Sequence, residues 1–433
     1  MEPDLDYFCE EELESADDLS DAETIEEEES SDSDEDIAND VNNEYDQIFY
    51  GKNKSTEWLD KPQKFSGKHH TATHARNEGT VHPNIPSHSV KAVFQMFMTE
   101  QIIEKVTVCS NRKGKQKHGN NWEDIDETEL LAWIGLNIRS GINQDGFRPV
   151  SELFSSKEGP AIYSAAMSRK RFNDIKDVIR FDNIETRHER REKGKQGSLA
   201  PIKELFDMFM EACNSNYKPS QKVTIDESIV GFKGKCSFKI YMPSKPIKHG
   251  VKIWSMCDSA NAYLCNAQIY QGKQFEKAEV GQGKRVVLDL TSGITGSGRN
   301  VTTDNFFTSV PLCQELHKRN LTLLGTIRRN KPEVPPSFQG SKAREVHSTK
   351  FGFAKDSKIM MASYVPKKGK SVIMLSSAHY NSSIEENPPF KPQLILDYNK
   401  SKGGVDTFDQ CVKKLQKQAH NYPLALSLIL LDH

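Results

Sequence analysis

Zinc-binding and disulfide patterns are both missing from this 433-residue sequence. Its eight cysteines are scattered, and no two of them form a C-x-x-C pair. We therefore expect no zinc site and no disulfide framework. The sequence also has no apolar run of about twenty residues, the length that a membrane-spanning helix needs. Its first residues, MEPDLDYFCEEE, lack the basic and apolar regions of a signal peptide. These absences favour a reducing compartment, the cytoplasm or the nucleus.

Lysine and arginine are absent from the first 46 residues, which contain twenty-two of the 61 acidic residues. Residues 1–46 are too charged, and have too few aromatic side chains, to bury a core, so we expect a disordered acidic tail. The rest of the chain has about nineteen more basic than acidic side chains. That excess is typical of proteins that bind a polyanion such as DNA. The tail would either shield the basic surface when DNA is absent or simply keep the protein soluble.

Residues 47–89 are polar, with scattered glycine, proline and histidine, and the composition predicts a flexible linker. A helical domain is expected over residues 90–215, because its apolar residues recur with a period of 3.6. The predicted helices cover 90–113, 126–142, opened by Asp126 and Glu129 as a capping box, and 168–183, opened by Ser168.

Two basic patches lie within this helical domain, 169-RKR-171 and 187-RHERREKGK-195. Phosphate contact is one interpretation of both. The alternative is that the first patch is a solvated helix face and the second a flexible loop. The sequence does not decide between phosphate contact and this alternative.

From residue 216 the apolar period changes to two, which is typical of strands. Strands alternating with helices indicate an α/β core with some antiparallel pairing, over residues 216–330. The predicted elements are a strand at 221–232, a hairpin from 250–257 and 262–270, a strand, turn and helix at 299–320, and a strand at 321–329.

Short alternating runs with turns between them predict a β-rich insertion over residues 331–400. The runs are 349–354, 359–365, 371–377 and 393–398. The final part of the core is expected at 401–433. Its last segment, 424-LALSLILL-431, is apolar on nearly every face, so it needs to be covered.

Three aspartates stand out by position. Asp226 lies inside an apolar strand, Asp304 follows a strand and precedes two phenylalanines, and Asp406 follows 400-KSKGG-404 at the start of a helix. A carboxylate in a sheet costs several kcal/mol unless it is paired or binds a cation. Two or three aspartates from separate elements are a common ligand set for Mg²⁺. Pairing of Asp226 with a lysine, and helix capping by Asp304 or Asp406, are the alternatives.

The motifs around these acids resemble the DNA transposases of the piggyBac family. They are 224-TIDESIVGF-232, 299-RNVTTDNFFTSVPL-312 and 403-GGVDTFDQ-410, in that order, supported by 168-SRKRF-172 and 322-TLLGTIRRNKPEVP-335. The resemblance runs from about Val90 to the end of the chain.

This resemblance implies an α/β, ribonuclease H-like catalytic core with a β-rich insertion, preceded by a helical domain for dimerisation and DNA binding. It implies that Asp226, Asp304 and Asp406 are catalytic metal ligands and that Asp409 is a further catalytic acid. The expected cofactor is Mg²⁺ or Mn²⁺. The expected reaction is cleavage of DNA ends through hairpins and joining at TTAA sites, by a nuclear homodimer bound to double-stranded DNA.

Basic residues near the acidic motifs are candidates for DNA binding through phosphate contacts: Lys245, Lys248, Arg328 and Arg329. Lysines near a three-acid cluster could instead serve to balance its charge. Gly403 and Gly404 are expected to let the chain approach the catalytic centre closely.

Two departures from the family pattern lead to a second hypothesis. Tyrosine stands in 421-NYP-423 where the family has tryptophan, and the cysteine-rich zinc domain is not found. The sequence is therefore compatible with an active transposase or with a truncated, transposase-derived DNA-binding protein that has no transposition activity.

Overall fold

A computed structural model describes residues 47–63, 78–81, 89–145, 148–193, 197–232, 234, 236–243, 248–272 and 279–413. The acidic tail, Lys245 and the apolar segment 424–431 lie outside the described residues. The chain forms two compact units, which are treated separately below. Unit 1 comprises Met1–Thr73 and Asn300–Lys400, and unit 2 comprises His74–Arg299 and Ser401–His433. These units divide the chain differently from the predicted domains, because residues 300–330 group with the insertion.

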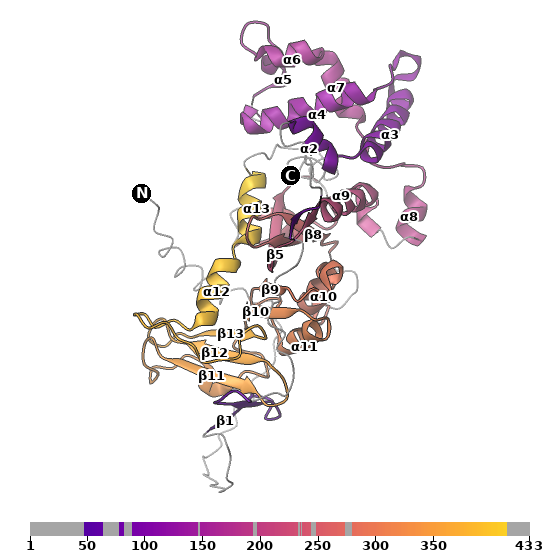
Figure 1. The fold of residues 1–433 in the computed structure, drawn as a ribbon. Coiled ribbons are helices and arrows are strands. Elements are labelled where there is room, and N and C mark those ends of the chain that lie inside the picture. Colours follow the sequence, from indigo (N-terminus) through magenta and orange to yellow (C-terminus); the bar gives the residue numbers. More distant parts are fainter. Residues whose placement is uncertain are drawn as a thin grey trace. The chain divides into compact units, whose positions relative to one another are not determined.

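Unit 2 begins with a set of helices (Figure 1). The helices and short 3-10 turns of this first set are α2 (Val90–Phe97), α3 (Glu100–His118), η1 (Gly119–Asn121), α4 (Glu127–Ile142), α5 (Val150–Leu153), α6 (Ala161–Ala166), α7 (Arg169–Val178), α8 (Arg187–Lys193), η3 (Gly197–Leu199) and α9 (Lys203–Asn216). None of the described helices is both long and apolar enough to cross a membrane.

The predicted helix starts at Asp126 and Ser168 are confirmed. The Asp126 carboxylate accepts a hydrogen bond from the Glu129 amide at 2.7 Å, and the Ser168 hydroxyl accepts one from the Arg171 amide at 3.1 Å. The single helix predicted over 90–113 is wrong, since α2 ends at Phe97 and α3 restarts behind Thr99. The Thr99 hydroxyl accepts from the Ile102 amide and caps the new helix, a local bond that the apolar periodicity does not reveal.

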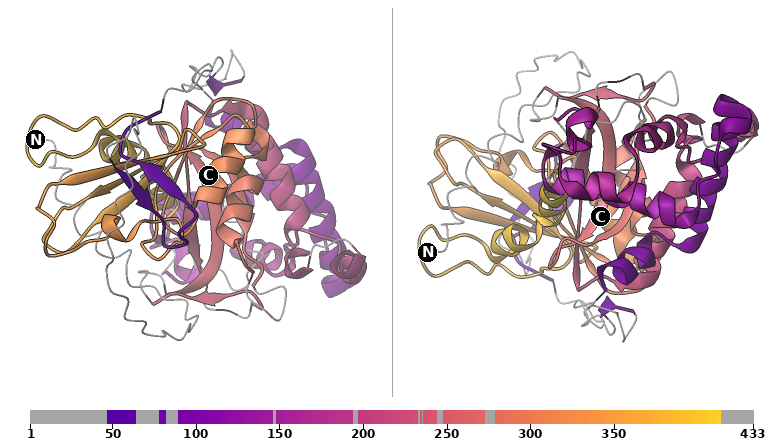
Figure 2. Two further views of the ribbon diagram at one scale, coloured as in Figure 1. Left: turned by 90° about the horizontal axis from the view of Figure 1, so that it is seen from below. Right: turned by 90° about the horizontal axis from the view of Figure 1, so that it is seen from above.

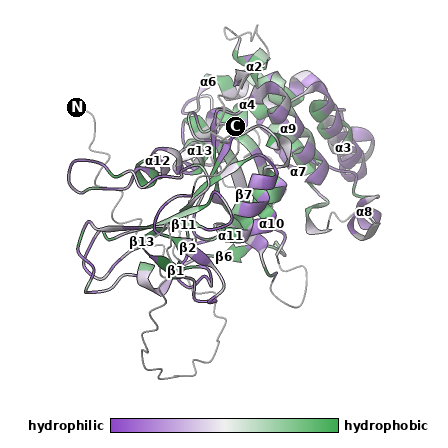
Figure 3. Ribbon diagram, turned by 60° about the horizontal axis from the view of Figure 1, so that its bottom comes forward, coloured by the Kyte–Doolittle hydropathy of each residue, from purple (hydrophilic) through white to green (hydrophobic). Residues whose placement is uncertain are grey.

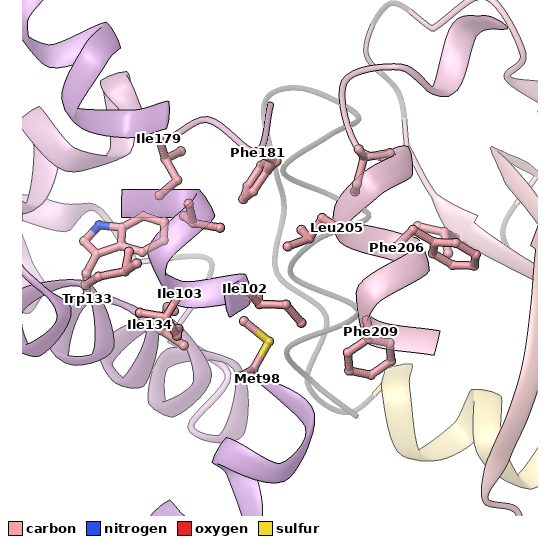
Figure 4. Close-up of a cluster of buried hydrophobic side chains, with 14 of the residues drawn as sticks. Met98, Ile102, Ile103, Trp133, Ile134, Ile179, Phe181, Leu205, Phe206 and Phe209 are labelled. Carbon is pink, nitrogen blue, oxygen red and sulfur yellow. The ribbon is translucent and has the colours of Figure 1, made fainter. Parts of the chain in front are cut away.

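The helices of unit 2 share a core with its strands. Met98, Ile102, Trp133 and Phe209 are buried in this core, and Figure 4 shows Met98 and Ile102 beside the side chains of α9. Apolar and polar residues alternate along these helices in Figure 3, as expected for helices with one buried face. The same cluster includes residues of β5 (Lys222–Gly231), β7 (His249–Asp258), β8 (Leu264–Ile269) and α13 (Gly404–Lys413), so the helical segment and the strand that carries Asp226 share one core.

Most strands of unit 2 pair antiparallel beside this core, and two short strands form a separate two-stranded sheet. The predicted strand at 221–232 and the hairpin at 250–270 are confirmed. The elements are β3 (Gly79–Thr80), β4 (Tyr217–Lys218), β5 (Lys222–Gly231), β6 (Ile240–Tyr241), β7 (His249–Asp258), β8 (Leu264–Ile269), α10 (Gln282–Leu290), η4 (Ser292–Ile294) and α13 (Gly404–Lys413). β5 pairs with β7, which also pairs with β6 and β8, and β3 pairs with β4.

Unit 1 contains a parallel pair and an antiparallel extension. Strand β9 (Asn300–Thr303), helix α11 (Val310–Lys318) and strand β10 (Thr322–Thr326) form a β-α-β unit, as the sequence predicts. Antiparallel strands then follow across the sheet in the order β13 (Val372–Ser376), β12 (Met360–Tyr364), β11 (Thr349–Ala354), β2 (Glu57–Leu59) and β1 (Ile48–Tyr50). Along the chain, the 3-10 turn η5 (Pro336–Phe338) lies between β10 and β11.

Part of the segment predicted as linker, 47–89, belongs to this sheet instead. β1 and β2 form a hairpin, and β2 pairs with β11. Figure 2 shows this hairpin in indigo beside the orange strands. The Trp58 side chain is fully buried, and its Nε1 donates to the Glu333 carbonyl at 2.9 Å. The short apolar runs here are stabilised by a partner far along the chain, which local composition cannot show.

The run 393–398, predicted as a strand, forms the start of α12 (Gln393–Ser401). Leu394, Ile395 and Tyr398 lie on one helical face and pack against buried side chains of β12 and β13. Their spacing fits a 3.6-residue period at least as well as strand alternation, and the apolar face of the sheet decides between the two.

Candidate active site

Asp226 lies in the middle of β5, opposite Ser255 of β7. Because side chains alternate along a strand, Asp226 shares its face with Thr224 and Ser228. Its side chain is half-buried, and its Oδ1 accepts a hydrogen bond from the Glu227 amide at 2.7 Å. The opposite face of β5 carries Glu227, which forms an ion pair with Lys252. Lys252 thus pairs with Glu227, the residue next to Asp226.

Helix α13 lies beside β5 in Figure 1 and packs against β5 and β7. The Thr224 hydroxyl donates to the Ser401 carbonyl, just before the helix. A Cβ atom on Gly404 would lie 3.0 Å from the Thr224 hydroxyl and 3.2 Å from the Asp258 carbonyl, whereas one on Gly403 would meet nothing within 4 Å. Of the two glycines, only Gly404 is required for the close approach.

Asp406 and Asp409 lie one turn apart on α13. Val405 and Val412 are buried and Phe408 packs partly against the core, which defines the inner face of the helix. Asp409 borders this face and is half-buried, whereas Asp406, in the first turn, is exposed. A carboxylate in the first turn of a helix is favoured by the helix dipole.

The buried thiol of Cys257 is affected by the charges of two of these acids. Cys257 lies opposite Thr224 on β7 and is fully buried. Burial raises the pKa of this thiol, and the neighbouring Cys265 and the negative charges of Asp409, Asp258 and Asp226 raise it further. Because α13 packs on the face of β5 that carries Thr224 and Asp226, this helix and its Asp409 lie on the same side of the β5–β7 ribbon as Asp226.

Asp304 belongs to unit 1, where it follows β9 directly. Its Oδ1 accepts from the Phe306 amide at 3.0 Å, and its carbonyl accepts from the Thr308 amide at 3.1 Å and the Thr308 hydroxyl at 2.7 Å. The acid is thus fixed in a tight turn and does not cap α11, whose cap is Ser309. Asp226, Asp406 and Asp409 thus belong to unit 2, and Asp304 belongs to unit 1.

The donor chemistry of these acids fits a hard divalent cation, because carboxylate oxygens are the ligands that Mg²⁺ prefers. Among the residues that the structure describes, no three His, Cys, Asp or Glu side chains are close enough together to hold a metal ion. The case for a metal site therefore rests on the kind of donor atom and on the packing of α13 against the face of β5 that carries Asp226.

The predicted phosphate-binding residues are distributed over both units. Lys248 is exposed just before β7 in unit 2. Arg328 and Arg329 are exposed just after β10 in unit 1, and the Arg328 Nε donates to Asn305 Oδ1 at 3.2 Å. Asn305 is the residue after Asp304, so Arg328 lies beside that acidic turn.

Arginines in the two basic patches have structural partners. Arg187 and Arg190 in α8 bind the carboxylate of Asp182, whose exposed fraction is 3%, at distances down to 2.6 and 2.5 Å. Segment 187–193 is therefore a helix held by a buried acid, which corrects the flexible-loop alternative. Arg171 likewise binds Glu129 through two hydrogen bonds of 2.6 Å and lies over the Trp122 ring.

Asp258 is a structural residue that the sequence shows only as part of a turn. It is fully buried and accepts hydrogen bonds from Tyr217, Ser220 and Ala260 at 2.6–2.8 Å. These bonds join the end of β7 to the segment that precedes β5. The partners are far apart along the chain, so no local signal could have identified the network.

A mixed α/β fold with Asp226 on a strand, Asp304 after another strand and Asp406 on a helix is the fold of a transposase. The family model described as Transposase IS4 matches residues 89–429, well over half of the chain. A solved structure of piggyBac transposase, in a synaptic complex with hairpin DNA, is similar with a TM-score of 0.76 and 32% sequence identity. The match covers 82% of this chain and 76% of that one. The chain therefore belongs to the piggyBac family of transposases, and the predicted α/β fold class is confirmed.

Two human proteins are also similar in sequence. PiggyBac transposable element-derived protein 3 is 23% identical over 340 residues, and PiggyBac transposable element-derived protein 2 is 24% identical over 341 residues. Each match covers 74% of this chain, and 55% and 56% of the respective human protein. The chain thus spans about half the length of these curated relatives.

Proposed function

We propose that this protein is a DNA transposase that cleaves and joins DNA strands at TTAA sites with a divalent metal. The observation that carries the proposal is the packing of α13, which carries Asp409, on the face of β5 that carries Asp226, in a chain with the fold of a piggyBac transposase. Asp226, Asp304 and Asp406 are the proposed metal ligands, and Asp409 supports them.

Mg²⁺ or Mn²⁺ would be held by the carboxylates of Asp226, Asp304 and Asp406. When bound, such an ion activates an attacking water or hydroxyl and stabilises the leaving oxygen of a phosphodiester. The chain itself orients the carboxylates. The Glu227 amide fixes one oxygen of Asp226, and the Phe306 amide fixes one oxygen of Asp304. The rigid strand β5, the tight turn after β9 and the short aspartate stems then limit how far these carboxylates can move.

Double-stranded DNA is the proposed partner, and a nuclear homodimer is the proposed assembly. The similar piggyBac structure is a complex with hairpin DNA. The excess of about nineteen basic side chains in residues 47–433 supports binding of a polyanion. Lys245, Lys248, Arg328 and Arg329 are the proposed phosphate contacts.

A transposase-derived DNA-binding protein without transposition activity is the second candidate. It is favoured by the two human relatives, which are both named as transposable element-derived proteins. In this case the fold and the DNA affinity persist and strand cleavage is lost.

Nicking of supercoiled plasmid by the full chain, with and without Mg²⁺, tests the proposal. We expect Asp226→Asn and Asp304→Asn to abolish metal-dependent nicking and to leave DNA binding intact, because each removes one anionic ligand. Asp356→Asn is the matched control, since Asp356 is exposed in the turn between β11 and β12.

Unchanged nicking in Asp304→Asn would overturn the assignment of that ligand. If the parent protein binds DNA in a salt-sensitive way but shows no metal-dependent nicking, the second candidate is correct.

A further inference from the structure

A cleft in unit 1, next to the turn that holds Asp304, is lined by basic side chains from two separate segments. Its volume is about 110 Å³, and its walls are the end of β10, the segment at Gln339 and Gly340, and the turn that leads into β13. The Ile327 amide donates to the Ile373 carbonyl at 2.9 Å, which joins the first and last of these walls. We propose that this cleft binds a backbone phosphate of DNA and that Lys370, from the β-rich insertion, is one of its ligands.

The charge of the cleft supports an anionic ligand. Arg328, Arg329 and Lys370 line it and are exposed, and none of the described residues that line it is acidic. A fourth cation lies beside it, since the Lys52 Nζ donates to the Arg329 carbonyl at 3.1 Å. Basic side chains that converge on one concave surface repel one another, and a bound phosphate relieves this repulsion through charge-assisted hydrogen bonds.

Glycines set the shape of the cleft. A Cβ atom on Gly340 would lie 2.6 Å from the Gly369 carbonyl oxygen and 2.9 Å from the Lys370 carbonyl carbon, so only glycine allows the turn to approach this closely. Gly369 has φ of +78°, a left-handed conformation that glycine adopts without strain. The position of the turn therefore depends on Gly340 and Gly369, and replacing the Lys370 side chain leaves this frame in place.

The position of the cleft relates it to the proposed reaction. Asn305 lines the cleft, accepts from Arg328 and directly follows Asp304. Phosphates of one DNA strand are spaced about 3.4 Å apart along the helix axis. A strand with one phosphate in the cleft therefore presents a neighbouring phosphate near Asp304. This inference rests on the proposed function, and it makes the insertion part of the DNA-binding surface.

The test is equilibrium binding of the full chain to a fluorescent DNA duplex at several salt concentrations. We expect Lys370→Gln to weaken binding several-fold and to lower the slope of log affinity against log salt by about one, the value for one lost phosphate contact. Lys370→Arg should restore binding. Lys368→Gln is the matched control, because Lys368 is an exposed lysine of the same turn that does not line the cleft.

Equal effects of Lys368→Gln and Lys370→Gln, or no effect of Lys370→Gln, would overturn the proposed cleft while the proposed function stands. If the parent protein fails to bind DNA, the proposed function itself fails. A second arm titrates inorganic phosphate alone. Phosphate binding that depends on Lys370, together with DNA binding that does not, would show a free-anion site and refute the DNA assignment.

Discussion

A single buried carboxylate, Asp182, determines the role of two arginines that the sequence places in a basic patch. Arg187 and Arg190 keep about a fifth of their side-chain surface exposed, at 22% and 16%, while Asp182 keeps 2%. Burying an ion pair is costly by itself, but removing only one partner leaves an uncompensated charge in a poorly hydrated place. The carboxylate and both guanidinium groups therefore depend on one another.

Removal of this carboxylate should destabilise unit 2. We expect Asp182→Ala to lower the free energy of unfolding by about 3 kcal/mol, because both arginines lose their buried partner. The measurement is urea unfolding followed by circular dichroism. Asp177→Ala is the control. Asp177 pairs with Lys117 at the surface, where both side chains are about half exposed, and its loss should cost less than about 1 kcal/mol. Equal losses in both variants would contradict the structural role of Asp182.

The hairpin of β1 and β2 shows how an element far away in the sequence completes a sheet. β2 pairs with β11, the Trp58 side chain is buried beneath it, and Phe49 meets the Phe338 ring edge-on at 5.2 Å between centroids. The aromatic side chains, rather than the few backbone bonds of two three-residue strands, are the main stabilising contribution. Without this hairpin, β11 would be an unpaired edge strand.

Loss of the Trp58 side chain should expose that edge. We expect Trp58→Ala to destabilise the hairpin by about 3–5 kcal/mol, as for other buried aromatic residues. Hydrogen exchange should accelerate in β2 and β11, and the helices of unit 2 should keep their protection. Tyr50→Ala, at a side chain that is half exposed on β1, should change exchange little. Acceleration confined to β1, with β11 unchanged, would show that the hairpin does not cover the sheet edge.

At the scale of the whole molecule, charge is divided between the acidic first 46 residues and the basic remainder. The near-neutral total, with a formal net charge of -3, hides this division. A polyanionic segment on the same chain competes with DNA for basic surfaces, and salt weakens that competition as it weakens DNA binding. The tail is therefore expected to tune DNA affinity.

Neutralising part of the tail should strengthen DNA binding at low salt. The variant replaces Glu26, Glu27, Glu28 and Glu29 with glutamine in the full chain. We expect several-fold tighter binding at about 50 mM salt and a smaller difference at about 200 mM, because screening weakens the intramolecular competition. The measurement is fluorescence anisotropy with a DNA duplex. Glu385→Gln with Glu386→Gln removes exposed acids of unit 1 as a control. An equal effect per charge in both variants would mean that only net charge matters.

Much of the fold follows from local patterns. The helix starts at Asp126 and Ser168, strand β5 and the β7–β8 hairpin are all predictable, since a cap or an alternation involves residues close together in the sequence. The exceptions are Thr99, β2 and α12. A helix break, a strand with a distant partner and a short apolar run on a sheet face each depend on contacts that the local pattern does not contain.

The candidate site divides in the same way. The motifs identify Asp226, Asp304 and Asp406, but only the structure shows that Asp409 is more buried than Asp406 and that Gly404, not Gly403, makes the close contact. The cleft beside Asp304 was also not predictable as a unit. Arg328 and Lys370 are more than forty residues apart, and Gly340 brings the turn into place.

The sequence by itself determined the family, the fold class, which acids are the candidates and the charge division, because motif order, composition and short-range periodicity are properties of the chain alone. The tertiary structure decided which basic residues serve the fold, which segments complete a sheet and which lysine joins the cleft. Those outcomes depend on burial and on partners brought together from distant parts of the chain, as with Asp182, Trp58 and Lys370.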